Sequence, residues 1–305
     1  MSKPKPKQAI SVEGAVALSD ALRFACVAGE VMSAPLPVAR RASRSSAANA
    51  ADGESNTAII GTLQEKRMHA AIKRYLCDDM TCHERPVPDF LVAEGGKSRR
   101  VVADILTDGE ILEVQTGGFH PLRKKIDYYL THTPYRVTVV HPIPAVRYLS
   151  WIAPADGQVI SRRKSPKRGR VRDIARELFW LSEFVGNPRF SIRLLLVELE
   201  EYRFADGWSR DGKRGSNRYE RFPTALLGDV TLATSADYAA YFLPEVLDAR
   251  LDDGGNPQPF TAAEYAKASG IHGMATYSML RLLCSLGLVE QTEKIGRSQG
   301  YRVVT

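Results

Sequence analysis

An Asp108-Gly109 dipeptide stands between two runs of apolar residues, and it constrains the fold more than any other feature of the sequence. Asp-Gly in this setting is a strong signal for a β-hairpin with a two-residue type I′ turn. Such a turn places Asp104 of the first strand opposite Glu113 of the second, with Cβ atoms about 4.5–5.5 Å apart. The sequence therefore predicts two neighbouring carboxylates on paired apolar strands.

The elements around this hairpin alternate between helical and extended patterns, which is typical of an α/β fold. Apolar spacing predicts a helix over 59–76, and short apolar or β-branched runs predict strands over 90–93 and 135–141. Pro142 is expected to end the second of these strands. A helix over 121–131, with proline in its first turn, joins the hairpin to that strand, so we expect a right-handed βαβ unit.

The chain as a whole is expected to have four parts. An Ala/Ser/Pro-rich stretch over 33–55 has few large apolar residues, whereas 14–32 has the pattern of a short amphipathic helix. In the middle of the chain, 173–186 has a helical pattern, 190–204 that of a strand and 207–221 that of a loop. The four parts are a flexible N-terminal segment (1–56), an α/β domain (57–155), a basic middle region with helix and strand elements (156–250) and a C-terminal domain (258–305).

The C-terminal domain has the pattern of two helices followed by a β-hairpin. Thr261 and Glu264 form a capping box, and a second helix is expected over 274–286. This order is the plan of a winged helix-turn-helix domain. A role in protein–protein contact or dimerisation is the alternative to DNA binding. If the domain binds DNA, the expected contacts are Thr276, Tyr277 and Arg281 on the second helix and Lys294 and Arg297 on the wing.

Opposed carboxylates on apolar strands repel one another unless a hard cation lies between them. Mg²⁺ suits such a position, because it takes oxygen ligands and uses one or two carboxylates with waters and substrate phosphate. Glu65 adds a third carboxylate, since it lies on the same helical stripe as Met68 and Ile72. A glutamate on an apolar stripe is unusual and predicts a partner.

This arrangement resembles the PD-(D/E)XK nuclease superfamily, which includes many restriction endonucleases and archaeal Holliday-junction resolvases. The resemblance covers about residues 59–142. It implies a mixed sheet of the restriction-endonuclease type, flanked by helices. Residue by residue, Glu65 matches the helix glutamate of that family, Asp104 its aspartate and Glu113 its strand glutamate. Gln115 stands where the family usually has lysine; some restriction enzymes of the family have glutamine there.

The resemblance also implies a reaction, the metal-dependent hydrolysis of DNA by an endodeoxyribonuclease. Asp104, Glu113 and the backbone carbonyl of Val114 would bind Mg²⁺, for which Mn²⁺ can substitute, and Glu65 would help directly or through water. The metal would activate a water that attacks a phosphodiester and leaves a 5′-phosphate. Gln115 would orient that water. Lys124 or Lys125 on the following helix is the candidate for the missing lysine.

Charge and composition favour a polyanionic partner inside the cell. The chain carries 42 lysines and arginines against 35 acidic residues, a net charge of +7. No run approaches the ~20 apolar residues of a membrane-spanning helix, and four scattered cysteines form no disulfide framework. We therefore expect a cytoplasmic, nucleoid-associated protein. Residues 162–172 hold seven basic residues and no acid, and the candidate phosphate contacts are Arg162, Arg163, Lys164, Lys167, Arg168 and Arg170.

Each of these functional interpretations has a structural alternative. Asp104 and Glu113 can face solvent or pair with basic neighbours, Glu65 can pair with His69, Gln115 can be a polar edge residue, and the basic run can be a solvated loop. His69, Cys77, Cys82 and His83 lack the close ligand pairs of a zinc finger.

The function as a whole also has alternatives. A non-catalytic DNA-binding regulator that keeps the nuclease fold would explain Gln115. A nuclease directed at RNA would explain the basic loops, because phosphate contacts do not distinguish RNA from DNA. A homodimer is expected by analogy with nucleases of this fold.

Overall fold

The computed structural model describes residues 16–32, 57–88, 101–205 and 218–304. Three sequence-based expectations lie outside these residues, at least in part: the strand over 90–93, the Ala/Ser/Pro-rich stretch over 33–55 and residues 207–217 of the basic loop.

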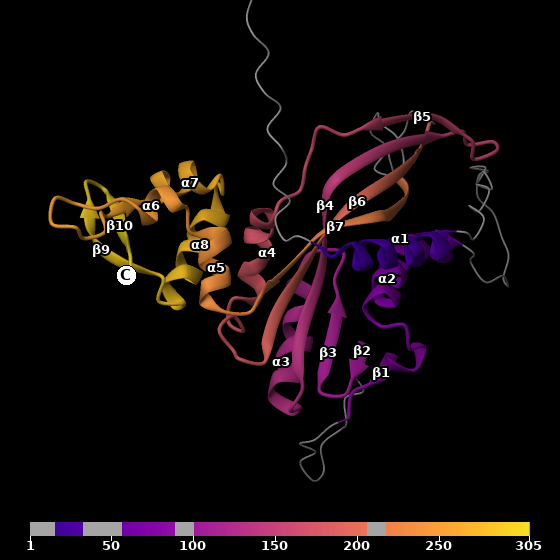
Figure 1. Ribbon diagram of the computed structural model, residues 1–305, viewed down its shortest axis with the longest axis horizontal. Helices are drawn as coiled ribbons and strands as arrows, with labels where there is room; N and C mark the ends of the chain where they lie inside the picture. Colours follow the sequence, from indigo (N-terminus) through magenta and orange to yellow (C-terminus); the bar gives the residue numbers. More distant parts are fainter. Residues whose placement is uncertain (1–15, 33–56, 89–100, 206–217, 305) are drawn as a thin grey trace, which may run out of the picture.

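Seven of the described strands form one mixed sheet in the middle of the molecule (Figure 1). The order is β1-β2-β3-β4-β6-β7, with β5 paired to β4. The β3–β4 and β4–β6 pairs are parallel, and the others are antiparallel. The strands are β1 (His83–Pro86), β2 (Val102–Thr107), β3 (Glu110–Val114), β4 (Arg136–Ile152), β5 (Val159–Lys164), β6 (Phe190–Phe204) and β7 (Arg218–Leu232).

The β2–β3 hairpin has the predicted register but a different turn. Thr107 pairs with Glu110 across a two-residue loop, as expected. Gly109 has φ +96°, whereas Asp108 is not among the described residues with positive φ. A type I′ turn needs positive φ at both central positions, and a type II turn needs it only at the second. The prediction of a type I′ turn was therefore wrong.

Strand β4 is much longer than predicted, because it continues through Pro142 instead of ending there. Its neighbour β3 ends at Val114, so this stretch of β4 pairs with β6 on one side only. The Pro144 carbonyl accepts from Gly169 N at 2.8 Å, on the side away from β6. The nitrogen of a strand residue points to the same side as its carbonyl, so neither proline interrupts the pairing with β6.

The expected boundary between domains 57–155 and 156–250 falls within one sheet, because β4 pairs with β6. Both long strands belong to one sheet, and β6 has the bounds predicted from the sequence. The expected helix over 173–186 is broken into three short pieces, η3 (Val171–Ile174), α4 (Ala175–Leu178) and η4 (Phe179–Leu181). Residues 218–221, expected in a loop, begin β7.

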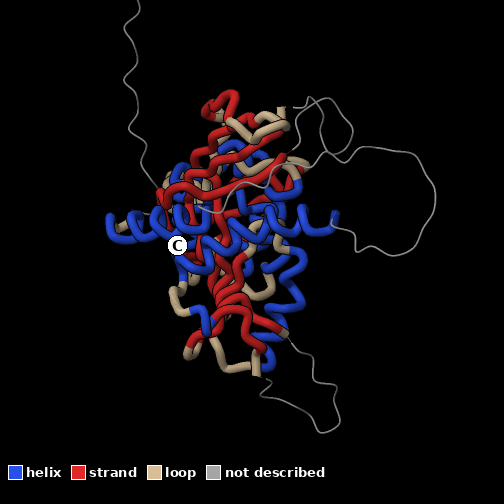
Figure 2. Tube along the Cα trace, turned by 90° about the vertical axis from the view of Figure 1, so that its right-hand side faces the viewer, coloured by secondary structure: helices blue, strands red, loops and turns tan. Residues whose placement is uncertain are grey.

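Helices cover both faces of the sheet, and Figure 2 shows the strands running down the middle with helices around them. On one face lie α1 (Leu18–Met32) and α2 (Thr57–Leu76), whose apolar side chains pack with those of β3, β4, β6 and β7. The other face carries α3 (Arg123–His132) and the short pieces η3, α4 and η4. The smaller helices are η1 (Met80–Cys82), η2 (His120–Leu122), α5 (Ser235–Phe242) and α6 (Glu245–Asp248).

The expectation of a flexible segment over 1–56 does not hold for α1. Phe24 and Ala28 are buried in the same apolar cluster as Ile72. This burial fixes the helix on the sheet, since each large apolar side chain contributes about 1.5–3 kcal/mol.

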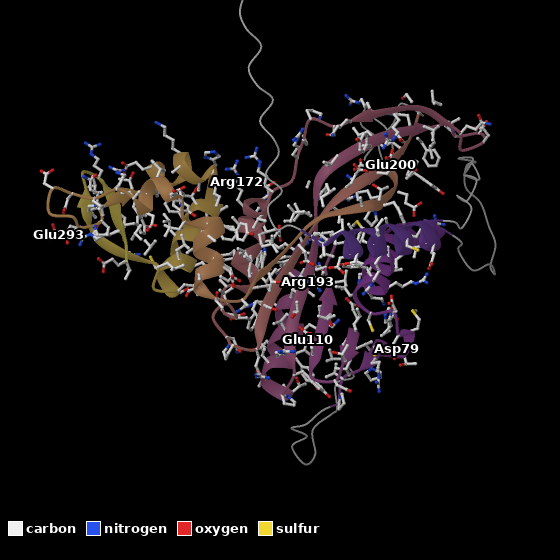
Figure 3. The ribbon with its side chains drawn as sticks, in the orientation of Figure 1. Asp79, Glu110, Arg172, Arg193, Glu200 and Glu293 are labelled. Carbon is white, nitrogen blue, oxygen red and sulfur yellow. The ribbon has the colours of Figure 1, made fainter. Side chains whose placement is uncertain are left out.

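The C-terminal part has the predicted order of elements. These are β8 (Phe260–Thr261), α7 (Ala262–Ser269), α8 (Met274–Ser285), β9 (Val289–Ile295) and β10 (Ser298–Val303). The strands form a separate sheet in the order β8-β10-β9, and Thr261 and Glu264 form the expected capping box. Helix α8 packs against α4 within one continuous apolar cluster. Arg172, labelled in Figure 3, joins the two parts by donating to the Ser269 carbonyl at 2.8 Å.

No helix in the described ranges is both long and apolar enough to cross a membrane.

Candidate functional site

Asp104 and Glu113 lie where the β2–β3 ladder stops. The last pair of that ladder is Ile105 with Leu112. Beyond it, Asp104 Oδ2 accepts from Val114 N at 2.8 Å, and Glu113 Oε1 lies 3.4 Å from Asp104 N. Side chains thus replace main-chain pairing. The two carboxylates are neighbours, as predicted, although each reaches a helix on a different face of the sheet.

Glu113 is held from helix α3. Its Oε2 accepts from Lys125 Nζ at 2.6 Å and its Oε1 from the Tyr129 hydroxyl at 2.8 Å. The glutamate is 2% exposed, and this burial raises its pKa, although Lys125 and Tyr129 oppose the shift. Burial beside Glu113 also raises the pKa of Tyr129, so the phenol remains a donor. Of the two candidate lysines, Lys125 is therefore the one that contacts Glu113, while the side chain of Lys124 is exposed.

The raised pKa of Glu113 predicts a pH-dependent effect on stability. A carboxyl whose folded pKa lies above its usual value of 4.5 stabilises the fold below that value and loses this contribution as pH rises. Glu113→Gln removes the titration. We expect the melting temperature of this variant, relative to wild type, to be more favourable at pH 7 than at pH 4. Thermal unfolding at both pH values measures this, and an offset independent of pH would contradict it.

Asp104 is held from helix α2. His69 Nε2 lies 3.0 Å from Asp104 Oδ2. Burial is the largest single influence and raises the pKa of Asp104, but His69, Lys125 and the Val114 amide together outweigh it, so the pKa is lowered. Asp104 is consequently ionised at neutral pH, as a metal ligand must be.

The side chain of Gln115 bonds to the backbone of the loop that follows β3. Its side-chain Nε2 donates to the Gly118 carbonyl at 2.5 Å, and its backbone carbonyl accepts from His141 Nδ1 at 2.6 Å. Burial lowers the pKa of His141, which favours the neutral ring. With Nδ1 donating, Nε2 of the neutral ring carries the lone pair.

The oxygens around Asp104 fit a divalent cation by their chemistry. Two carboxylates adjoin there, and the Val114 carbonyl points toward Asp104, since N–H and C=O of one strand residue point to the same side. Carboxylate and carbonyl oxygens are the ligands that Mg²⁺ prefers. No group of three His, Cys, Asp or Glu side chains is placed for a metal within the described residues. Glu65 lies in α2, but its side chain is outside them.

Three further residues contact the site and were not predicted from the sequence as site residues: His69, Tyr129 and His141. His69 comes one helical turn after Glu65, and Tyr129 one turn after Lys125, so each shares a helix face with a candidate residue. That spacing was the available signal. His141 had none, because its contact with Gln115 depends on the parallel β3–β4 register.

The predicted phosphate contacts of the basic run lie at the surface. On β5, Arg162 stacks over the Tyr148 ring at 3.7 Å and binds the buried Glu200, which is labelled in Figure 3. Arg163 lies over the Trp151 ring at 5.1 Å. The remaining members, Lys164, Lys167, Arg168 and Arg170, are also exposed.

The predicted DNA contacts of the C-terminal part are exposed with one exception. Tyr277, Arg281, Lys294 and Arg297 are exposed. Thr276 is 3% exposed, and its hydroxyl donates to the Ile271 carbonyl at 2.8 Å. The prediction that Thr276 faces DNA was wrong, because this side chain caps the turn between α7 and α8 from inside.

Comparisons with known proteins give a family and no activity. A family profile described as "Domain of unknown function (DUF8091)" matches residues 66–233. An uncharacterized protein of Treponema pallidum (strain Nichols) is 26% identical over 246 residues, which cover 80% of this chain and 87% of that protein. No solved structure matches the chain. The matched range spans β1 to β7, so the Asp104–Glu113 site lies inside the family's domain.

Proposed function

We propose that the chain, which belongs to the family defined by a domain of unknown function (DUF8091), is a metal-dependent endonuclease that hydrolyses DNA. In this proposal the large sheet is a nuclease core of the PD-(D/E)XK type, and the C-terminal part is a winged helix. The single observation that carries the proposal is the convergence of Asp104, Glu113 and Lys125 where β2 and β3 separate.

The chemistry of the site follows from its donors. Asp104, Glu113 and the Val114 carbonyl would hold Mg²⁺, which when bound would supply an activated water and stabilise phosphate charge. His69 holds one oxygen of Asp104 at 3.0 Å and so orients the carboxylate. Lys125, 2.6 Å from Glu113, brings a positive charge to the region where a phosphate would develop negative charge.

Two exposed basic surfaces support a nucleic-acid substrate. Strand β5 carries Arg162 and Arg163 over aromatic rings, an arrangement that keeps guanidinium groups extended at the surface. The C-terminal hairpin carries Lys294 and Arg297 near its tip. Cations on such surfaces contact phosphates and position the duplex.

The proposal is tested by cleavage of labelled DNA. The panel contains linear duplex, single strand, flap and four-way junction, each with Mg²⁺, Mn²⁺ or EDTA. We expect cleavage with either metal and none with EDTA. Matched RNA duplexes in the same assay separate a DNA nuclease from an RNA nuclease. A purified, folded protein that binds DNA but cuts no substrate in either metal would refute the nuclease proposal.

Adjacent lysines provide a matched pair for this assay. Lys125→Ala removes the cation beside Glu113, and we expect the cleavage rate to fall about a hundredfold, the range seen when one charge-stabilising group is lost. Lys124→Ala removes an exposed neighbour of the same charge, and its rate should stay within about twofold of wild type. Equal losses in the two variants would show that Lys125 acts only through net charge.

A non-catalytic DNA-binding regulator is the second candidate function, and the orientation of Gln115 favours it. Its side chain is bonded to Gly118 and is not directed at a water beside the carboxylates. In addition, both oxygens of Glu113 already have protein partners. For a regulator, DNA binding would be the same with EDTA as with Mg²⁺, and Asp104 could be replaced without effect on it.

A further inference from the structure

A cavity of about 450 Å³ opens beside β4, past the end of β3, and three cations lie in its wall. Its walls include Arg147 of β4 and Lys167 and Arg168 of the loop that follows β5. The volume lies within the range of small-molecule pockets, about 300–1,000 Å³. Neither Lys167 nor Arg168 forms an ion pair within the described residues. Arg147 Nε is buried and, in the same residues, has no hydrogen-bond partner.

The loop that carries Lys167 and Arg168 is fixed on β4 at both ends. Ser165 N donates to the Arg147 carbonyl, and Gly169 N donates to the Pro144 carbonyl, each at 2.8 Å. A Cβ at position 169 would lie 2.7 Å from the Ile143 side chain and 2.9 Å from the Pro144 oxygen. Glycine is therefore required for this close approach, and the backbone that carries the two cations is held on β4.

The acidic residues of the cavity wall are engaged by backbone amides. Asp173 accepts from Arg170 N and Glu177 from Phe119 N, both at 2.9 Å. These bonds direct carboxylate oxygens to the main chain. Arg147 is paired with Glu201 at 3.8 Å, so Lys167 and Arg168 are the cations that suit the cavity to an anion.

The cavity lies on the same side of the sheet as Glu113. In the parallel register Glu113 pairs with Val139, and His141, two residues further along β4, points to the same face. His141 lines the cavity and is bonded to the Gln115 carbonyl. The cavity thus begins at His141, about 7 Å along β4 from Val139, and its cations lie further along the same strand, beside Pro144 and at Arg147.

We propose that this cavity binds a phosphate group of the nucleic-acid substrate, on the same face of the sheet as the phosphodiester that is cut; the inference rests on the proposed function. Lys167 and Arg168 supply the charge, Arg147 supplies a buried N–H donor, and the fixed loop backbone supplies the geometry. The phosphate is either a 5′-terminal group or an internal one, and both have the same oxyanion chemistry.

The test measures binding without cleavage. Fluorescence anisotropy with EDTA present uses two 3′-labelled single-stranded oligonucleotides of one sequence, one with a 5′-phosphate and one with a 5′-hydroxyl. The variant Lys167→Ala/Arg168→Ala removes two cations from the cavity. Its matched control, Arg85→Ala/Arg136→Ala, removes two exposed cations from β1 and β4, outside the cavity wall and outside the proposed nucleic-acid contacts.

We expect the cavity variant to weaken binding at least tenfold, and the control less than threefold. A loss confined to the phosphorylated oligonucleotide assigns the cavity to a terminal phosphate, and an equal loss for both assigns it to an internal one. Equal losses in the two variants would overturn the inference. Because no metal is present, this result is independent of whether the protein cuts DNA, so failure of the cavity and failure of the nuclease proposal are separate outcomes.

Discussion

Asp104→Asn is expected to reduce metal-dependent DNA cleavage about a thousandfold, the largest effect on activity that we predict. The amide has no negative charge for a cation, and loss of several kcal/mol of charge stabilisation corresponds to this factor. The substitution keeps the shape of the side chain, and its oxygen can still accept from Val114 N. The fold should therefore remain, with a loss of about 1–2 kcal/mol from the weaker bond to His69.

Three measurements make this result interpretable. Cleavage is followed with Mg²⁺ and with Mn²⁺, circular dichroism confirms the fold, and DNA binding is measured with EDTA. We expect unchanged secondary structure and DNA affinity within about threefold of wild type, because phosphate contacts are made elsewhere. Cleavage at the wild-type rate by a folded Asp104→Asn protein would exclude this carboxylate from the reaction.

Glu201→Ala is expected to produce the largest loss of stability that we predict, about 2–3 kcal/mol, the range for losing hydrogen bonds to a charged group whose partners keep access to solvent. The side chain of Glu201 is fully buried. It lies within ion-pair distance of Arg147 at 3.8 Å, Arg203 at 2.5 Å and Arg218 at 3.5 Å. Removing the carboxylate leaves three neighbouring guanidinium groups without their shared counter-charge, so these cations repel one another.

An exposed glutamate provides the control for this effect. Glu290 pairs with Arg302 at 3.8 Å, and both side chains are exposed. Glu290→Ala should cost less than about 1 kcal/mol, as exposed ion pairs do. Denaturant unfolding of both variants measures the difference, and the melting temperature of Glu201→Ala should fall on the order of 10 °C. A loss in Glu201→Ala no larger than that in Glu290→Ala would show that the arginines find other partners.

Sequence signals predicted an element correctly where neighbouring residues decide its structure. The Asp108-Gly109 dipeptide predicted the hairpin register, and Thr261 with Glu264 predicted the start of α7. A run rich in Leu and Val predicted the bounds of β6. In each case the signal, a tight turn, a capping box or a run of strand-favouring residues, lies among neighbouring residues.

Signals failed where a distant segment decides the outcome. Pro142 normally ends a strand, but here β3 stops short and leaves the proline nitrogen on an unpaired side. Thr276 is a different case, because its partner is local: it has the position of a DNA-facing residue on a second helix, but its hydroxyl donates to the Ile271 carbonyl of the preceding turn.

The sequence by itself determined that Asp104 and Glu113 are neighbours and that a lysine follows on the next helix, because hairpin register and helix spacing are local. Only the tertiary structure decided which groups surround these carboxylates. Lys125 rather than Lys124 reaches Glu113, and His69 reaches Asp104 from a helix on the opposite face. The physical reason is that packing of α2 and α3 on the sheet fixes these contacts. The hydrophobic effect that drives this packing is non-directional, so the sequence does not show which face of the sheet each helix covers.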